Sequence, residues 1–305
     1  MPGLILHHYD TSPFSEKVRI VLGMKGLNWR SVTVPVIAPK PELTPLTGGY
    51  RRTPVLQVGC DVYIDTQLML AEIERRFPEP KLVRSGMDWV VNQWADRQFF
   101  QTTVPIIFGA IGEHVPAAFI KDREQLSGRP FDPAAMRAAA PAMRAQWRAQ
   151  AGWIESGLAS AGGDWLGGGA PRLADAAAYM NFWFLGSSLP ELMRELIAGY
   201  DRLPAWLDRM AAVGHGHATD MTGSEALAVS SGSDPEPSPP HDEHDPLGLV
   251  AGDPVFVMAD DYGRDRVEGR LVAANPERIV LSRDDAAAGT VRVHFPRTGY
   301  VAGRA

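Results

Sequence analysis

The chain of 305 residues contains a single cysteine, Cys60. One cysteine can form neither an internal disulfide nor a thiolate metal cluster, so a reducing compartment and a cytoplasmic protein are predicted. Apolar runs are too short for a transmembrane helix, and the first of them lacks the preceding basic charges of a signal peptide. The net charge of -6 and the scattered arginines argue against a nucleic-acid partner, which requires concentrated positive charge. We therefore expect a soluble protein with no membrane or nucleic-acid partner.

Apolar residues make up 45% of the chain, enough for a real core, and the length exceeds that of one domain. The first eighty residues alternate between strand and helix patterns. Strands are predicted at 4–9, 29–36, 54–58 and 61–64, and helices at 13–24 and 66–76. From Ser85 onward long helical patterns replace the strands. The sequence thus predicts an α/β domain at residues 1–80 and an all-helical domain at 85–216.

The last third of the chain changes character again. Residues 217–245 hold a predicted short helix and then a stretch rich in Ser, Pro, Asp and Glu, the composition of a linker. Beyond it, short strand patterns at 255–258, 267–273, 278–283 and 290–295 predict a small β-barrel at 246–305. We expect this tethered barrel to be dispensable for the function of the first two domains, and an interaction module is the functional alternative for it.

A candidate functional motif lies at the junction of the first predicted strand and the first predicted helix. Ser12 is placed as the N-cap and Pro13 at the first helical position, which by themselves form an ordinary helix start. Two further motifs follow in order: Tyr50-Arg51-Arg52-Thr53-Pro54-Val55-Leu56 and Asp65-Thr66-Gln67. Taken together, the three motifs resemble those of thioredoxin-fold glutathione transferases, with Ser12 standing where redox members carry cysteine. The resemblance covers roughly the first 220 residues, and the barrel resembles no known family.

The resemblance implies that glutathione is the co-substrate and that Ser12 donates a hydrogen bond to its thiolate. Lowering a thiol pKa by about two units requires roughly 2.7 kcal/mol. A charge-assisted hydrogen bond supplies about 1.5 to 3 kcal/mol, and a helix N-terminus adds about 0.3 to 1 kcal/mol. These contributions suffice without a metal or a histidine base.

The other motifs are implied to hold the rest of the tripeptide. A cis Thr53-Pro54 bond would leave the backbone of Val55 free to pair with it like an added strand. Asp65 and Thr66 would bind the γ-glutamyl ammonium and carboxylate. The remaining implied contacts come from Phe14 and from two cations that could hold the glycyl carboxylate, Arg52 and Lys40.

A second substrate is expected between the domains, against Tyr9, Phe14, Phe99, Phe100 and Thr103. The last three lie on a long helix that Pro105 should kink. Each candidate also has a structural interpretation that the residues alone leave open. Ser12, Asp65 and Thr66 could be helix caps, the two cations could be solvated surface charges, and the aromatic residues could be core.

The favoured function is attack by glutathione on a small hydrophobic electrophile, in a homodimer. One alternative is a non-catalytic protein that binds glutathione and hydrophobic ligands. A second is a glutathione-dependent reductase, for which Cys60 is the only available thiol. No metal is expected, because the histidines with ligand-like spacing lie in segments without a predicted scaffold, His215 with His217 and His241 with His244.

Overall fold

The computed structural model describes residues 3–305, so the first two residues of the expected N-terminal domain lie outside the described part. The N-terminal elements are β1 (Leu4–His8), α1 (Pro13–Met24), β2 (Asn28–Thr33), α2 (Thr44–Thr47), β3 (Val55–Val58), β4 (Asp61–Ile64) and α3 (Thr66–Arg76). Strand β1 pairs in parallel with β2 and antiparallel with β3, which pairs antiparallel with β4. This confirms the α/β arrangement that the alternation of patterns predicted, and its topology is the thioredoxin-like one that the resemblance implied.

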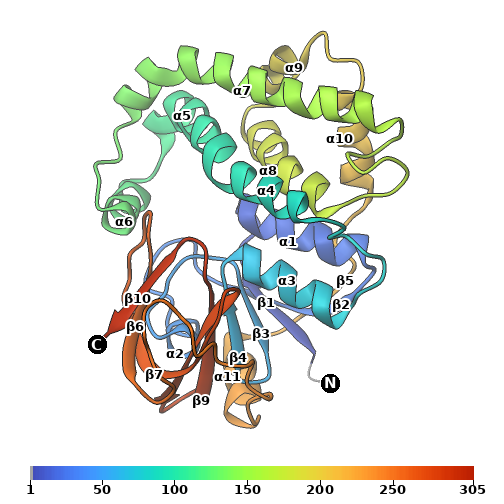
Figure 1. The fold of residues 1–305 in the computed structure, drawn as a ribbon. Coiled ribbons are helices and arrows are strands. Elements are labelled where there is room, and N and C mark those ends of the chain that lie inside the picture. Colours follow the sequence, from blue (N-terminus) through green and yellow to red (C-terminus); the bar gives the residue numbers. More distant parts are fainter. Residues whose placement is uncertain (1–2) are drawn as a thin grey trace.

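The central part of the chain is helical, as expected. Its elements are α4 (Gly86–Trp94), η1 (Ala95–Phe99), α5 (Phe100–Ile111), η2 (Gly112–His114), α6 (Ala117–Ser127), α7 (Pro133–Ala161), α8 (Leu173–Ser188), α9 (Pro190–Ile197) and α10 (Leu203–Ala212). Helix α8 runs through the middle, and its Phe182 ring lies 5.0 Å from that of Trp147. Figure 1 shows α1 and α3 between the sheet and these helices. One face of the sheet is thereby covered.

A single wide turn, η1, lies within the long helix at residues 95–99. The N–H of Phe100 bonds to the carbonyl of Ala95 five residues earlier, and that carbonyl also accepts from the side chain of Asn181 at 3.0 Å. Such π-type turns shift the register of the side chains that follow and often occur at functional sites. Here Phe99, the last residue of the turn, is fully buried, and the next residue, Phe100, lines a cavity.

The C-terminal strands do not form the expected separate barrel. The remaining elements are β5 (His217–Asp220), α11 (Gly223–Ser231), β6 (Pro254–Ala259), β7 (Val267–Ala274), β8 (Arg278–Asp285), β9 (Gly289–Pro296) and β10 (Tyr300–Arg304). They join the N-terminal strands in one ten-stranded sheet of order β10-β6-β7-β8-β9-β4-β3-β1-β2-β5. The physical reason is that β4 would otherwise be an open edge, and β9 pairs with it in parallel.

The two parts also share one hydrophobic core. Val62 and Ile64 of β4 are fully buried with Val293 and Phe295 of β9, in a cluster that includes β6 to β8 and Leu46 of α2. This cluster lies on the face of the N-terminal sheet opposite α1 and α3. The C-terminal strands therefore complete the core of the first domain.

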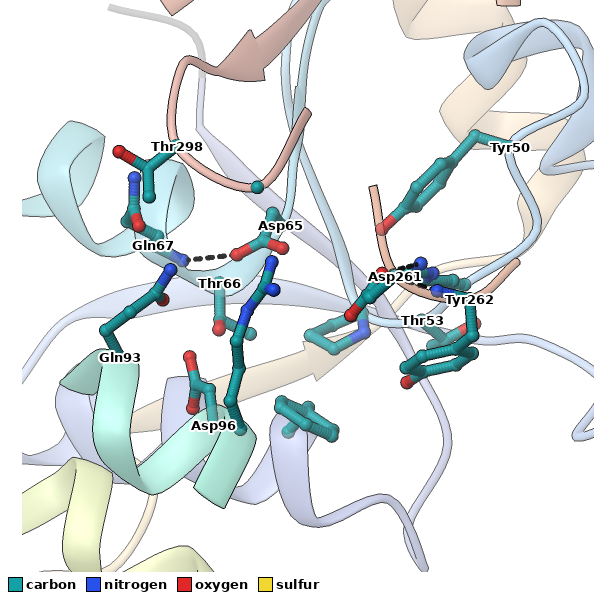
Figure 2. Close-up of a pocket in the computed structure, with 15 residues that line it drawn as sticks. Tyr50, Thr53, Asp65, Thr66, Gln67, Gln93, Asp96, Asp261, Tyr262 and Thr298 are labelled. Carbon is teal, nitrogen blue, oxygen red and sulfur yellow. Dashed lines mark hydrogen bonds and ion pairs between the residues drawn. The ribbon is translucent and has the colours of Figure 1, made fainter. Parts of the chain in front are cut away.

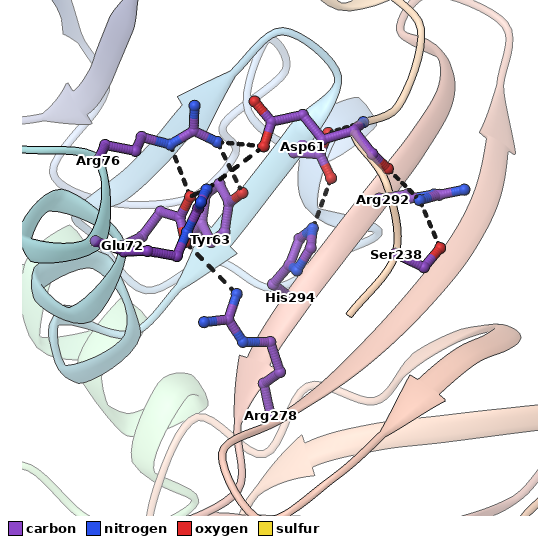
Figure 3. A network of polar contacts seen from close by, with 10 residues as sticks. Asp61, Tyr63, Glu72, Arg76, Ser238, Arg278, Arg292 and His294 are labelled. Carbon is purple, nitrogen blue, oxygen red and sulfur yellow. Dashed lines mark hydrogen bonds and ion pairs between the residues drawn. The ribbon is translucent and has the colours of Figure 1, made fainter. Parts of the chain in front are cut away.

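The stretch predicted as a loose tether is instead held in place, which corrects that expectation. The backbone N–H of Glu236 donates to Asp61 at 2.9 Å, and its carboxylate accepts from Arg76 at 2.6 Å. Arg292 of β9 donates to the Glu236 carbonyl at 2.6 Å. Figure 3 shows this network between β4, α3 and β9. A Pro- and Ser-rich composition indicated local flexibility, but it carried no information about these long-range contacts.

Across residues 3–305, none of the helices combines the length and the apolar character needed to cross a membrane.

Candidate functional site

Two adjacent compartments lie where the N-terminal sheet, the long helix and the C-terminal part meet. The larger has a volume of about 610 Å³ and the smaller about 70 Å³. Phe14, Arg52, Thr53 and Tyr262 line both, so these side chains form the boundary between them. The two compartments are therefore adjacent and separated by these four side chains.

Ser12 lies at the wall of the larger compartment and is the N-cap of α1. Its side-chain oxygen accepts the N–H of Ser15 at 3.1 Å, and it is only 2% exposed. Within the described chain the hydroxyl donates to no acceptor, so its hydrogen is available to a ligand. A thiolate placed there would receive this hydrogen bond and would also benefit from the positive end of α1.

The smaller compartment is built around the start of α3. Asp65 is the N-cap of this helix, with a positive φ of 69°, and its carboxylate accepts the N–H of Gln67 at 2.9 Å. Thr66 and Gln67 line the same space. Figure 2 shows these residues together, with Gln93 and Asp96 of the long helix nearby. A helix N-terminus flanked by carboxylates can bind a zwitterionic group, its anion at the N–H groups and its cation at the carboxylates.

Asp96 is a contributor that the sequence motifs did not indicate. It lies in the wide turn η1 and accepts from the buried Lys17 of α1 at 2.6 Å. Its neighbour Arg97 pairs with Asp260 of the C-terminal part at 2.8 Å. Nothing local to residues 95–97 signals this role, because it depends on the turn and on partners far away in the chain.

The C-terminal part forms one wall of both compartments. Asp261 pairs with Arg52 at 2.5 Å, and the Tyr262 ring lies 4.0 Å from the Arg52 guanidinium. Thr298 and Gly299 close the smaller compartment. Burial raises the pKa of Tyr262, so its hydroxyl stays protonated at neutral pH. The C-terminal part therefore contributes to the site wall, which the sequence did not predict.

A hydrogen-bonded tyrosine pair connects the last strand to Asp65. The hydroxyls of Tyr50 and Tyr300 lie 3.0 Å apart, and that of Tyr300 donates to Asp65 at 3.3 Å. Burial raises the pKa of both tyrosines, which keeps both hydroxyls protonated. Asp65 thus receives one hydrogen bond from its own helix and one from β10.

Lys40 is a buried cation in the larger compartment. Its ammonium donates to the Thr53 hydroxyl at 2.5 Å and lies 5.7 Å from the ring of Tyr9. Burial, together with the nearby charges of Arg123 and Arg51, lowers the pKa of Lys40 to about 8. This lysine is therefore not the solvated surface charge that was the structural alternative, and it is available to an anion.

The other candidates divide between the cavity and the core. Tyr9, Phe14 and Phe100 line the larger compartment, and Pro54 lines the smaller one after a cis Thr53-Pro54 bond. Phe99 and Thr103 do not reach either compartment, because they face the helical core, where Thr103 donates to the Phe99 carbonyl at 3.2 Å. These two positions correct the expected substrate contacts.

Val55 also lies outside the site. It is fully buried in β3, opposite His7 of β1 and Ile64 of β4, and lines neither compartment. With neighbouring strands on both sides, its backbone is not an open edge for a ligand. Thr53, two residues earlier, lines both compartments and precedes the strand. Thr53, rather than Val55, is therefore the residue at this end of β3 that faces the compartments.

The only cysteine and the histidines with ligand-like spacing lie outside both compartments. Cys60 is buried in the β3–β4 turn, lines neither compartment, and has a pKa raised by burial to about 11. His215 lies 3.0 Å from Glu16, and His241 accepts the N–H of Ala274. Among the residues from 3 onward, no group of three or more His, Cys, Asp or Glu side chains could hold a metal ion.

Comparison with known proteins identifies two matching regions. Residues 6–81 match the model of the glutathione S-transferase N-terminal domain, and residues 111–218 match a domain of unknown function. No curated protein matches the chain.

Solved structures extend the match to the whole chain. A GST-like protein from Pseudomonas syringae is 38% identical, with a TM-score of 0.82 and 100% of both chains covered. A glutathione S-transferase from Rhodospirillum rubrum shares 20% identity and a TM-score of 0.52 over 69% of this chain and 87% of its own. A glutathione transferase from Phanerochaete chrysosporium shares 19% identity and a TM-score of 0.56 over 69% and 97%. The last two show likeness of fold alone.

Fold and site thus define a thioredoxin-like domain joined to a helical domain and completed by a C-terminal extension of its sheet. The chain belongs to the glutathione S-transferase family.

Proposed function

We propose that this protein is a glutathione transferase in which Ser12 stabilises the thiolate of bound glutathione. The observation that carries the proposal is the position of the Ser12 hydroxyl, at the N-terminus of α1 and on the wall of a cavity of about 610 Å³. A hydrogen-bond donor at a helix N-terminus favours the ionised form of a thiol.

The positions proposed for the other groups of glutathione depend on which residues line the two compartments. The γ-glutamyl group would enter the smaller one, with its ammonium near Asp65 and Asp96 and its carboxylate at the start of α3, at Thr66 and Gln67. The glycyl carboxylate would approach Lys40, with Arg52 beside it. The thiol between these ends would then lie near Ser12.

The proposed reaction is nucleophilic substitution or addition on a small hydrophobic electrophile. The thiol proton leaves to solvent and the sulfur forms a bond to carbon. In a substitution the carbon–halide bond breaks and the halide departs, whereas in an addition the carbon takes a proton. The aromatic wall of the larger compartment, formed by residues such as Phe100, Phe108 and Phe184, suits the apolar part of such a substrate.

The test is conjugation of 1-chloro-2,4-dinitrobenzene by the wild type and by Ser12→Ala. Loss of a charge-assisted hydrogen bond should reduce kcat/KM by about tenfold to a hundredfold. Ser12→Thr, which retains a hydroxyl, should keep part of the activity. Full activity in Ser12→Ala would leave Ser12 as a helix cap alone.

Disulfide chemistry provides the complementary test. A reductase passes through a mixed disulfide that needs a protein thiolate beside the bound thiol. Cys60 is buried and protonated at neutral pH, so we expect negligible reductase activity with hydroxyethyl disulfide in the wild type. Ser12→Cys should acquire it, because α1 would stabilise the new thiolate. Reductase activity in the wild type that disappears in Cys60→Ser would overturn this assignment.

We also propose that the protein is a cytoplasmic homodimer. Exposed apolar side chains on neighbouring helices support self-association: Met87 is 63% exposed, and Val90 and Trp153 are each 57% exposed. The Trp153 ring lies 5.8 Å from that of Trp94, so the surface is continuous between α7 and α4. Light scattering after gel filtration should report a dimer, and Trp153→Ser should shift it toward monomer.

A further inference from the structure

The charged side chains that line the larger compartment are all positive. Of the described residues that line it, five are Lys or Arg and none is Asp or Glu: Lys40, Arg51, Arg52, Arg123 and Arg129. Glutathione in the proposed pose accounts for Lys40 and Arg52, which lie beside Thr53 at the boundary. The other three cations, Arg51, Arg123 and Arg129, have no part in binding glutathione in this pose.

Arg123 of α6 is the clearest of these. Its guanidinium lies 4.5 Å from the Phe119 ring and donates to the Val36 carbonyl at 3.2 Å. Its ion-pair partner Asp122, at 3.3 Å, is buried and is shared with Arg51, also at 3.3 Å. Arg51 also pairs with a second carboxylate, that of Asp265 at 3.6 Å. Neither carboxylate lines the cavity, so the groups that face it from this side are the guanidiniums.

Apolar surface lies directly next to this charge. Phe108, Phe119 and Phe131 form a cluster in which ring centroids are 5.1 to 6.1 Å apart. Since Arg123 covers one of these rings, its charge stands at the edge of the cluster. The low pKa of Lys40 also reflects a locally positive environment, because the charges of Arg123 and Arg51 contribute to it.

We propose that the second substrate is an apolar molecule that carries a carboxylate. Its apolar body packs against Phe108, Phe119 and Phe131, and its carboxylate pairs with Arg123, with Arg129 in support. A carboxylate there would gain a charge-assisted hydrogen bond in a partly buried place. This assignment rests on the proposed transferase function for its place in a reaction, but the binding that it predicts does not depend on turnover.

The test compares binding of decanoate and decanol, which have the same chain length and differ in charge. Calorimetry on the full-length protein should show decanoate binding about tenfold more tightly at pH 7. Arg123→Met should remove most of that preference while leaving decanol unchanged, which also shows that the variant is folded. Arg129→Gln, at an exposed position, should have a smaller effect, about threefold. Arg144→Gln, an exposed arginine of α7, is the matched control and should change nothing.

Two results would overturn the proposal. Equal affinity of the wild type for decanoate and decanol would show that the cations do not select an anion. Weaker binding of S-methylglutathione, rather than of decanoate, in Arg123→Met would assign Arg123 to the glycyl carboxylate instead. Repeating the titrations with saturating S-methylglutathione separates the two sites further, because decanoate that occupied the glycyl site would be displaced. Conjugation of neutral 1-chloro-2,4-dinitrobenzene reports on the transferase function separately.

Discussion

The two compartments of the site differ in size, polarity and origin. The smaller, of about 70 Å³, holds three carboxylates and takes its walls from six separate parts of the chain, including the loops before β7 and β10. The larger, of about 610 Å³, is mainly apolar, has cations at its edge and is built mostly from α5, α6 and the neighbouring loops. A narrow polar compartment is suited to one fixed group, whereas a wide apolar one tolerates many. The difference teaches that, in the proposed pose, two loops of the C-terminal part contribute to the glutathione compartment, while α5 and α6 contribute to the compartment for the electrophile.

The largest effect that would test this comparison is removal of residues 233–305. We expect an insoluble or unfolded protein, because the deletion exposes buried side chains of the N-terminal sheet, including Val62 and Ile64. Each fully buried aliphatic side chain contributes about 1.5 to 3 kcal/mol, and a whole domain is stable by only about 5 to 15 kcal/mol. Soluble yield and the melting temperature measure the outcome.

A point variant separates the core from the site wall. Val293→Asp places a charge where β9 meets β4 at Val62, and it should lower the melting temperature strongly. Val301→Asp introduces the same charge at a position that is 40% exposed and serves as the control. A soluble truncated protein with an unchanged melting temperature would restore the C-terminal part to an independent module.

The same comparison explains what the sequence could predict. The site residues at the starts of two helices could be predicted because each follows a local rule. Ser12 and Asp65 are N-caps at the starts of α1 and α3, and both helices have the bounds that were predicted. Local hydrogen bonding and periodicity fix such positions without reference to the rest of the chain.

Residues that depend on distant partners could not be found in this way. Tyr262 and Thr298 lie in turns with no distinctive pattern, and they reach the site only because β9 extends the sheet at β4. Phe99 and Phe100 are equally aromatic, and the wide turn between α4 and α5 decides which of them faces the cavity. Register within a helix that contains such a turn cannot be read from periodicity.

The second largest effect should come from Asp65→Asn. Asparagine can still cap α3 and tolerates a positive φ, so the change removes the charge and retains the local structure. If the γ-glutamyl ammonium pairs with Asp65, affinity for S-methylglutathione should fall more than tenfold. Calorimetry measures the affinity, and the melting temperature verifies that the cap is intact. Unchanged affinity would assign Asp65 to capping alone.

A third, smaller effect is the pH dependence of glutathione binding that the titration of Lys40 should cause. Lys40 has a pKa of about 8, so it is charged below that pH and becomes neutral above it. If it pairs with the glycyl carboxylate, affinity for S-methylglutathione should fall severalfold between pH 7 and pH 9. The thioether has no thiol to titrate. Lys40→Arg keeps its charge over this range, so it should lose this part of the pH dependence, and an identical pH profile in both proteins would exclude Lys40 from the site.

The smallest expected effect tests whether the last strand tunes the polar compartment. Tyr300→Phe removes the hydroxyl that donates to Asp65 at 3.3 Å and accepts from Tyr50, while the ring keeps its place in the core beside Phe295. A hydrogen bond of this length contributes about 0.5 to 1 kcal/mol, so affinity for S-methylglutathione should fall by about twofold to fivefold. The loss should be absent in an Asp65→Asn background if Tyr300 acts through the Asp65 carboxylate, which a double-mutant cycle measures. Binding of decanol in the larger compartment should be unaffected. A loss of equal size in both compartments would instead indicate a general disturbance of the sheet.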